Sequence, residues 1–296
     1  MAPVTRVLCP VDFSDASRHA LDHAVMIAGW FRSHLTVMHV RHPAFVAEPP
    51  ILFAEIADTE ADTLDDVAAR LETWLGPVRA AGIACDVLAV DGNNPAARIV
   101  EAVTHVGADL VVMGTHGRRG FERLLLGSVA ERVVRTAPCP VVTVPPPSVT
   151  TSALPFKRIV CAVDFSESSI NAVHFARTLA HESNSTLTLV HVLEWPMENE
   201  ALAMFDMTAY RDAVQKDAEE RLAALAADPE YGPKRPATRL VTGKPYAQIL
   251  AFAAEDKADI VVLGVHGRNP IDMMLFGSTT NQVIRQATCP VLTLRQ

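Results

Sequence analysis

The feature that most constrains this chain is that its second half repeats its first. The segment Leu8–Ser14 (LCPVDFS) is matched by Val160–Ser166 (VCAVDFS) at an offset of 152 residues. Further along, Gly114 is matched by Gly264 at an offset of 150. Self-similarity at a fixed spacing is the sign of a duplicated structural unit. The 296 residues therefore form two domains of similar size, each long enough to bury its own core.

Within each half, short apolar runs alternate with amphipathic segments. Apolar strands with little polar alternation, separated by helices, indicate a parallel sheet covered on both faces. The fold class predicted for each half is thus α/β and Rossmann-like, with a five-stranded parallel sheet between helices. In the first half we predict strands at Arg6–Val11, Leu35–Val40, Cys85–Val90, Asp109–Met113 and Pro140–Val144, and helices over residues 14–31, 56–81, 94–106 and 128–136.

A proline-rich stretch between the halves marks the linker. Pro145, Pro146 and Pro147 stand together and Pro155 closes the segment, so the connection is stiff. We predict a first domain at residues 1–146, a linker at 147–155 and a second domain at 156–296.

Composition excludes several classes of protein. The net charge of −8 disfavours a nucleic-acid surface, which needs clustered Lys and Arg. No apolar run reaches the roughly 18 residues of a membrane helix, and the first residues do not resemble a signal peptide. The five cysteines are odd in number and form no C-x-x-C pair, which favours reduced thiols. We expect a cytoplasmic protein without nucleic-acid or membrane partners.

A glycine-rich loop carries the strongest chemical signal. Gly114–Ser128 (GTHGRRGFERLLLGS) follows an apolar strand and leads into a helix, and it recurs as Gly264–Ser278 (GVHGRNPIDMMLFGS). A loop of this kind brings backbone N–H groups and a helix N-terminus onto an anion. The shared spacing, G-x2-G-x9-G-S, differs from both the P-loop and the dinucleotide fingerprint. It predicts a phosphate site of another kind.

Two further features fall at the carboxyl ends of predicted strands, where open parallel sheets bind ligands. Asp12 and Asp164 each end a first strand, and a carboxylate there suits a ribose hydroxyl or a nucleobase amine. Val40 and Val192 each end a second strand, where backbone groups could read an adenine edge. The pattern predicts a nucleotide across these strand ends.

Structural roles compete with these interpretations. Asp12 and Asp164 precede helices and could simply be caps. The glycines could serve loop geometry alone, although we expect Gly114 and Gly117 to allow close backbone approach and positive φ. The Ser128 hydroxyl could cap its helix or bind a phosphate oxygen.

The histidines divide into three groups. For His116 and His266, a solvent-facing role is as plausible as a phosphate contact. We interpret His39 and His191, which lie inside strands, as hydrogen-bonded core residues. We interpret the pair His19 and His23 as helix surface rather than metal ligands, because no third ligand is evident and the second half lacks the pair. Cys139 and Cys289, each before a proline, are interpreted as core.

With these motifs, the chain resembles the universal stress protein family in its tandem, ATP-binding form. The resemblance rests on the two V-D-F-S segments, the two G-x2-G-x9-G-S loops and the closing Cys-Pro-Val segments, and it covers nearly the whole chain. It implies a site for ATP, or for AMP or ADP, in each half, where a Mg²⁺ ion could accompany the phosphates. The implied residues are Asp12, Val40, Met113, Gly114, His116, Gly117, Arg118, Gly127, Ser128 and Val129 in the first half, and Asp164, Val192, Leu263, Gly264, His266, Gly267, Arg268, Gly277, Ser278 and Thr279 in the second.

The resemblance also implies that the two halves pack as an intramolecular pseudo-dimer through their fifth strands, and that chains pair again as homodimers. Two departures separate the halves. Pro10 is replaced by Ala162, and Arg119-Gly120 by Asn269-Pro270, where proline removes an N–H. If one site is weaker, we expect it to be the second.

Three functions remain open at this stage. The first is a stress-response module that binds an adenine nucleotide and changes conformation or partner. The second is a slow ATP hydrolase, for which Glu122, aligned with Asp272, is the best water-orienting candidate. The third is a scaffold without a ligand. The loop predicts phosphate binding more strongly than phosphate hydrolysis, so no catalytic residue is assigned.

Overall fold

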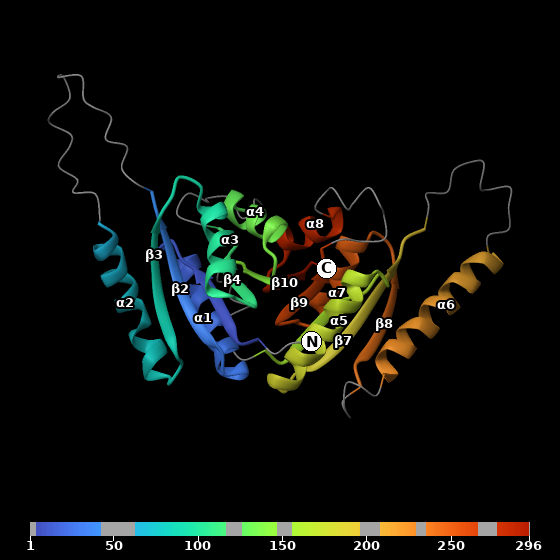
Figure 1. The fold of residues 1–296 in the computed structure, drawn as a ribbon. Coiled ribbons are helices and arrows are strands. Elements are labelled where there is room, and N and C mark those ends of the chain that lie inside the picture. Colours follow the sequence, from blue (N-terminus) through green and yellow to red (C-terminus); the bar gives the residue numbers. More distant parts are fainter. Residues whose placement is uncertain are drawn as a thin grey trace, which may run out of the picture. The chain divides into compact units, whose positions relative to one another are not determined.

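The chain forms two compact units. A computed structural model describes residues 4–42, 63–116, 126–146, 156–195, 208–228, 235–265 and 277–295. The units are Ala2–Pro146 and Pro147–Gln296, called domain 1 and domain 2 below. Each has its own strands and helices, in the same order along the chain (Figure 1).

Domain 1 is a doubly wound α/β domain. Its sheet has the order β3-β2-β1-β4-β5, with every pair parallel. The switch in strand order lies between β1 and β4. The elements are β1 (Arg6–Pro10), α1 (Asp15–Phe31), β2 (His34–Arg41), α2 (Leu64–Ala80), β3 (Cys85–Asp91), α3 (Pro95–Val106), β4 (Leu110–Gly114), α4 (Ser128–Thr136) and β5 (Val141–Val144).

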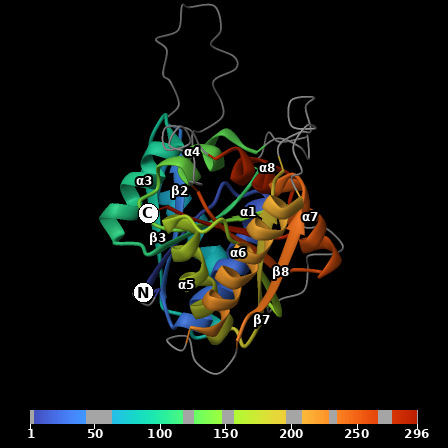
Figure 2. The same ribbon diagram turned by 90° about the vertical axis from the view of Figure 1, so that its right-hand side faces the viewer.

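Domain 2 repeats this arrangement. Its strands follow the order β8-β7-β6-β9-β10, and its switch point lies between β6 and β9. Figure 2 shows α6 running beside β8. The elements are β6 (Arg158–Ala162), α5 (Glu167–Glu182), β7 (Thr186–Leu193), α6 (Thr208–Ala227), β8 (Ala237–Thr242), α7 (Pro245–Glu255), β9 (Ile260–Gly264), α8 (Ser278–Gln286) and β10 (Val291–Leu294).

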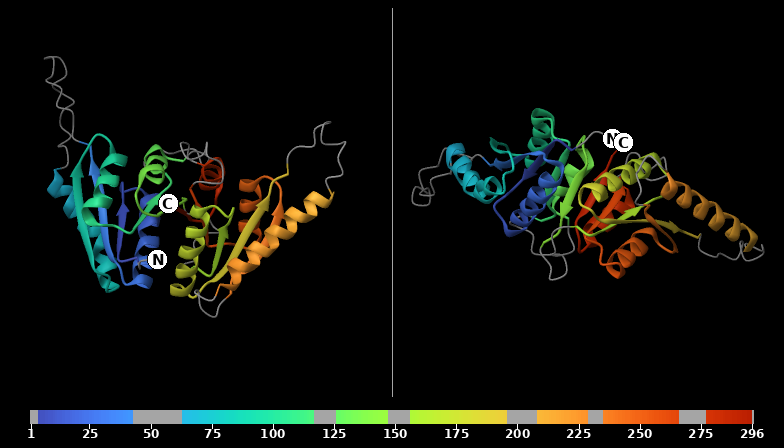
Figure 3. Two further views of the ribbon diagram at one scale, coloured as in Figure 1. Left: turned by 45° about the vertical axis from the view of Figure 1, so that its right-hand side comes forward. Right: turned by 90° about the horizontal axis from the view of Figure 1, so that it is seen from below.

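Burial on both faces explains why the central strands are continuous apolar runs. In β1 every residue after Arg6 is buried, and in β4 every residue before Gly114. Helix α1 packs on β1 and β4 and α2 on β2 and β3, whereas α3 packs on β1 and β2 and also contacts α4. Figure 3 shows the strands of each domain between their helices. The predicted fold class is therefore confirmed.

Helix starts follow the capping chemistry in the sequence, with one correction. The side chains of Ser14, Asn94 and Ser166 accept hydrogen bonds from the first turns of α1, α3 and α5. The predicted start of the second helix near Ile56 is wrong. Helix α2 begins at Leu64, because Thr63 has extended backbone and forms a reciprocal capping box with Asp66.

The cysteines are structural. All five are free thiols, as predicted from their number and spacing. Cys9, Cys161 and Cys289 are buried, while Cys139 and Cys85 are half-buried, so the interpretation as core is confirmed for Cys289 and not for Cys139. Burial raises the pKa of Cys139 and of Cys289 to about 12, so neither thiol is a nucleophile near neutral pH. Within the described ranges, no helix is long and apolar enough to cross a membrane.

Candidate functional site

The two predicted carboxylates lie in the same geometry at the carboxyl end of each first strand. Asp12 Oδ1 accepts from the backbone N and the hydroxyl of Ser14, at 3.1 and 2.5 Å. Asp164 Oδ1 accepts from Ser166 at 2.9 and 2.5 Å. In the described part of the chain, the second oxygen of Asp164 has no hydrogen-bond partner. The alternative that the aspartates cap helices is wrong, because the serines are the N-caps and the aspartates orient them.

The glycine that ends β4 or β9 is required by close packing. A Cβ on Gly264 would lie 2.8 Å from the carbonyl carbon of Ser168 and 2.9 Å from the backbone N of Ser169, in the first turn of α5. On Gly114 it would lie 3.3 Å from the carbonyl oxygen of Ala16. Positive φ is not the reason, since Gly114 does not have it. That part of the prediction is wrong for Gly114, and Gly117 lies outside the described residues.

The helices that follow the glycine loops begin without a side-chain cap. Gly127 and Gly277 are the N-caps of α4 and α8, and among the described residues no side chain accepts a capping bond there. Ser128 is the first helical residue, so the alternative in which it caps the helix is wrong. Uncapped N–H groups and the positive end of the helix dipole favour an anion. Each helix has nine residues, enough for a developed dipole.

Domain 2 contains a cavity of about 290 Å³ where these features converge. Its volume is near the lower end of small-molecule sites, which span roughly 300–1,000 Å³. Predicted residues on its wall come from the end of β6, from β7 and β9, and from the first turn of α8. The lining residues predicted from sequence are Asp164, Val192, Leu263, Gly264, Gly277, Ser278 and Thr279.

Other cavity residues escaped the sequence interpretation. Ser169, Glu194, Pro245 and Ile249 also line the wall. Pro245 and Ile249 lie in the first turns of α7 and face the cavity only because α7 packs on β7. Glu194 follows β7 directly, and its counterpart by sequence is His42. This replacement of an imidazole by a carboxylate is the one difference between the aligned halves that could have drawn attention to Glu194.

The described counterparts in domain 1 occupy the same topological positions. Met113 and Gly114 end β4, Val40 lies next to the end of β2, and Ser128 and Val129 open α4. The remaining predicted residues lie outside the described ranges. These are Gly117, Arg118, His266, Gly267 and Arg268, together with the water-orienting candidates Glu122 and Asp272.

The strand histidines belong to the structure around the carboxylates. His39 Nδ1 lies 2.7 Å from the carbonyl oxygen of Val11, and His191 Nδ1 lies 2.6 Å from that of Val163. This confirms that both are hydrogen-bonded, but only His191 is buried, so the interpretation of His39 as a core residue is wrong. In the loop, His116 Nδ1 is 2.8 Å from the Thr115 hydroxyl. Its Nε2 is buried and lacks a hydrogen-bond partner among the described residues, so the side chain is not simply solvent-facing.

The interpretation of His23 as helix surface is wrong. Its side chain is 1% exposed, its Nδ1 lies 2.9 Å from the carbonyl oxygen of His19, and the two rings meet edge to face at 4.6 Å. Burial lowers the pKa of His23 to about 4, so its ring is neutral near pH 7. No group of three or more metal-ligating side chains occurs in the described part of the chain. His23 is therefore part of the core of domain 1, while His19 is half-buried beside it.

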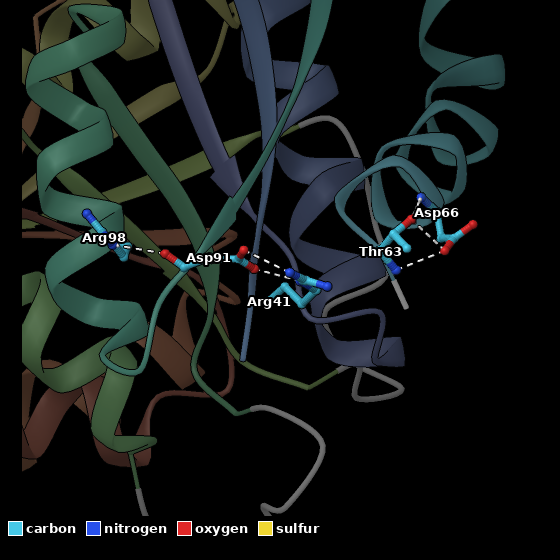
Figure 4. Close-up of polar contacts among 5 residues, drawn as sticks. All are labelled: Arg41, Thr63, Asp66, Asp91 and Arg98. Atoms are coloured by element: carbon cyan, nitrogen blue, oxygen red, sulfur yellow. Dashed lines mark hydrogen bonds and ion pairs between the residues drawn. The ribbon is translucent and has the colours of Figure 1, made fainter. Parts of the chain in front are cut away.

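An ion pair that the sequence interpretation missed closes the β2–β3 end of domain 1. The Arg41 guanidinium donates to both oxygens of Asp91, at 2.6 and 2.8 Å, and Arg98 Nε donates to the Asp91 carbonyl oxygen (Figure 4). The hydrogen bonds from Arg41 hold the pKa of Asp91 below its usual range. A Cβ on Gly92 would lie 2.6 Å from Arg98, so the glycine makes room for that side chain.

Phe13 and Phe165 were also missed. Each follows its aspartate with a φ of 63°, and each ring lies against a histidine and beneath an arginine. The signal in the sequence was the repeated V-D-F-S, where the phenylalanine appears in both halves. Local pattern alone could not show what the ring touches.

The chain is thus a tandem pair of open α/β domains, and in each an aspartate and a helix start without a side-chain cap lie at the carboxyl ends of the strands. The profile of the universal stress protein family matches residues 3–145 and again residues 155–295. The chain therefore belongs to the universal stress protein family and carries the family domain twice, as the motifs predicted.

Relatives agree with this assignment. A universal stress protein of Mycobacterium tuberculosis is 29% identical over 269 residues, which span 88% of this chain and 87% of that protein. One of Methanocaldococcus jannaschii is 37% identical over 148 residues, 48% of this chain and 82% of that protein. A solved protein of Pseudomonas aeruginosa, described as a putative universal stress protein, has a TM-score of 0.72 at 18% identity, covering 99% of this chain and 93% of that one. This last similarity shows the fold alone.

Proposed function

We propose that each domain binds an adenine nucleotide, ATP or AMP, at the carboxyl ends of its first, second and fourth strands. The observation that carries the proposal is the cavity of domain 2, which is lined by both a carboxylate and a helix N-terminus without a side-chain cap. Asp164 would accept from the ribose hydroxyls. The first turn of α8, from Ser278 to Thr280, would hold the phosphates.

The apolar part of the wall suits the base. Val190, Val192, Ile249 and Leu263 also line the cavity. A site with a mostly apolar body and a few placed polar groups is typical of small-molecule recognition. These apolar side chains would thus suit the base of a nucleotide.

The role we propose for binding is regulatory. A nucleotide can shift a conformational or association equilibrium only through different affinities for the two states. The hydrolase alternative has no observation in its favour among the described residues, since the cavity carboxylates there are Asp164 and the exposed Glu194. A Mg²⁺ ion would arrive with the phosphates. Pairing of chains remains a prediction, which sedimentation with and without ATP would test.

Two measurements on the purified full chain test nucleotide binding. Denaturing the protein and analysing the supernatant shows whether a nucleotide copurifies. Heating the protein at millimolar ATP measures stabilisation, which should reach about 2.7 kcal/mol when ATP is at 100 times its dissociation constant. A chain that releases no nucleotide and shows no melting shift at millimolar ATP would overturn the proposal.

Single-site variants separate the two sites. Asp164→Asn keeps an acceptor for Ser166 but removes the charge, so its site should lose tenfold or more in affinity. Equilibrium dialysis should then find one strong site in place of two, and none in the double variant with Asp12→Asn. Asp259→Asn is the matched control. That carboxylate binds the backbone of Lys157 and Arg158 at the opposite edge, so its loss should lower stability and leave ATP binding unchanged.

A further inference from the structure

The residue after each site carboxylate has a strained backbone. Phe13 and Phe165 both have a φ of 63°, in the left-handed region that side chains with a Cβ disfavour. A bulky residue persists there only when its surroundings hold it. The same conformation occurs in both domains, so a shared set of contacts must be responsible.

Those contacts are a stack of two side chains on each ring. The Phe13 ring lies 4.6 Å from the ring of His39, and the Arg70 guanidinium lies 4.1 Å from its centroid. The Phe165 ring lies 4.6 Å from His191 and 4.1 Å from the Arg221 guanidinium. Aromatic pairs and cation–π contacts at these distances are attractive. The arginines come from α2 and α6, so each stack joins three elements.

Each stack brackets an aspartate. In domain 1, His39 contacts the carbonyl oxygen of Val11, before Asp12, and the ring of Phe13, after it. In domain 2, His191 contacts Val163 and Phe165 in the same way. The backbone on both sides of the carboxylate is therefore fixed. With that backbone fixed, the following serine can reach Oδ1 with both its N–H and its hydroxyl.

We propose that Phe13 and Phe165 are positioning residues, which hold Asp12 and Asp164 in the orientation that receives the nucleotide. The proposal rests on the proposed function, since it assigns the phenylalanines a role in that same site. Phe165 is not among the residues that line the cavity of domain 2. Both rings would therefore act through the backbone of the neighbouring carboxylate, which they would preorganise for binding.

The two stacks differ in their support. In domain 1, Trp74 meets Phe13 edge to face at 5.3 Å, and Arg18 lies 4.1 Å over the Trp74 ring. The aligned residues in domain 2 are Leu225 and Ile170, which cannot form these two contacts. The Trp74 layer is therefore particular to domain 1, whereas the histidine and arginine contacts are common to both domains.

The test uses the full chain and radiolabelled ATP in equilibrium dialysis. Site 1 is measured with Asp164→Asn present and site 2 with Asp12→Asn present. Phe13→Leu and Phe165→Leu should each lower affinity at their own site at least tenfold. The Phe→Tyr variants keep the stack, so their affinity for ATP should stay within twofold of that of the same site with phenylalanine. Arg70→Met and Arg221→Met change exposed side chains and should fold, and each should lower the affinity of its own site for ATP.

Controls separate positioning from general stability. Leu71→Val trims a fully buried residue of α2 and should lower the melting temperature without changing ATP affinity. Hydrogen exchange at the Ser14 and Ser166 amides, without nucleotide, reports the bond to the aspartate directly. Phe→Leu should speed that exchange, and Phe→Tyr should not.

The outcomes distinguish the two proposals. An unsubstituted chain that binds no ATP overturns the proposed function and, with it, the role assigned to the phenylalanines. A chain that binds ATP as expected, with Phe→Leu variants within twofold of it and unchanged exchange at Ser14 and Ser166, overturns the positioning role alone.

Discussion

The carboxyl ends of the β2–β3 and β7–β8 strand pairs differ in their side chains but share their backbone pairing. In domain 1, Arg41 and Asp91 form a bidentate ion pair there. At the same register in domain 2 stand Leu193 and Thr242, which cannot form one. The last hydrogen bond between the two strands is nevertheless 2.9 Å in both domains, donated by Gly92 N–H to the Arg41 carbonyl and by Gly243 N–H to the Leu193 carbonyl. The ion pair is therefore an addition to this strand pairing rather than its cause.

Around Asp12 and Asp164, in contrast, the two domains share the same features. The aspartate with its serine, the left-handed phenylalanine against a histidine and the helix start without a side-chain cap occur in both domains. These features set backbone conformation or the approach of one backbone to another. Side chains that only pack or pair nearby differ between the domains. Comparing the two domains thus separates the features that set the backbone of the site from the side chains that support it in one domain only.

The largest predicted difference concerns a core position on the first helix of each domain. His23 has the aligned counterpart Phe175, and both are buried. The pKa of His23 in the folded state is about 4, below about 6.5 for an unfolded imidazole, so protonation favours unfolding. The contribution of the neutral His23 ring to the stability of the folded protein is complete above about pH 6.5 and is lost as the pH falls towards 4.

His23→Phe should therefore reduce the loss of stability between pH 7 and pH 4 by about 3 kcal/mol. Urea unfolding at the two pH values measures it. His19, whose pKa burial also lowers, stays in place and continues to contribute in the same direction. An unchanged acid sensitivity in the variant would show that His23 is not the buried titrating group.

The next largest effect compares two glycines. In Gly264→Ala the new Cβ meets backbone atoms of α5 within 3 Å, so the helix start must move, and we expect a loss of about 2 kcal/mol. In Gly114→Ala the nearest atom is 3.3 Å away, and about 0.5 kcal/mol should suffice. Urea unfolding of both variants measures the difference. Equal losses would mean that α1 and α5 approach their strands equally closely.

The smallest effect concerns the ion pair itself. Arg41→Leu with Asp91→Thr installs the residues of domain 2, and a double-mutant cycle isolates the coupling. The Asp91 side chain is 40% exposed and within reach of solvent ions, so the coupling should be weaker than both preceding effects and should vanish in high salt. Because Arg41 lowers the pKa of Asp91, the coupling is present near neutral pH and is lost as acid protonates the carboxylate. A coupling that survives high salt would contradict this.

Much of the fold could be predicted because its signals are local. Apolar runs mark the strands, Ser14 and Asn94 mark helix starts, and the repeated loop marks the fourth strand end. The helix start placed near Ile56 failed because an amphipathic pattern does not show where a helix begins, whereas the Thr63–Asp66 capping box does. At the site, the residue types and the strands that carry them followed from the same local signals.

Other properties depend on residues that lie far apart in the chain. Phe13, which lies between β1 and α1 with a left-handed backbone, packs against His39 of β2 and Arg70 of α2. Position 114 favours glycine because the carbonyl of Ala16, nearly a hundred positions earlier, lies close to where a Cβ would be. His23 is buried because α1 packs across the sheet. The sequence specifies the elements and their chemistry through short-range patterns, while packing between distant segments decides which side chains are enclosed and which backbone is strained.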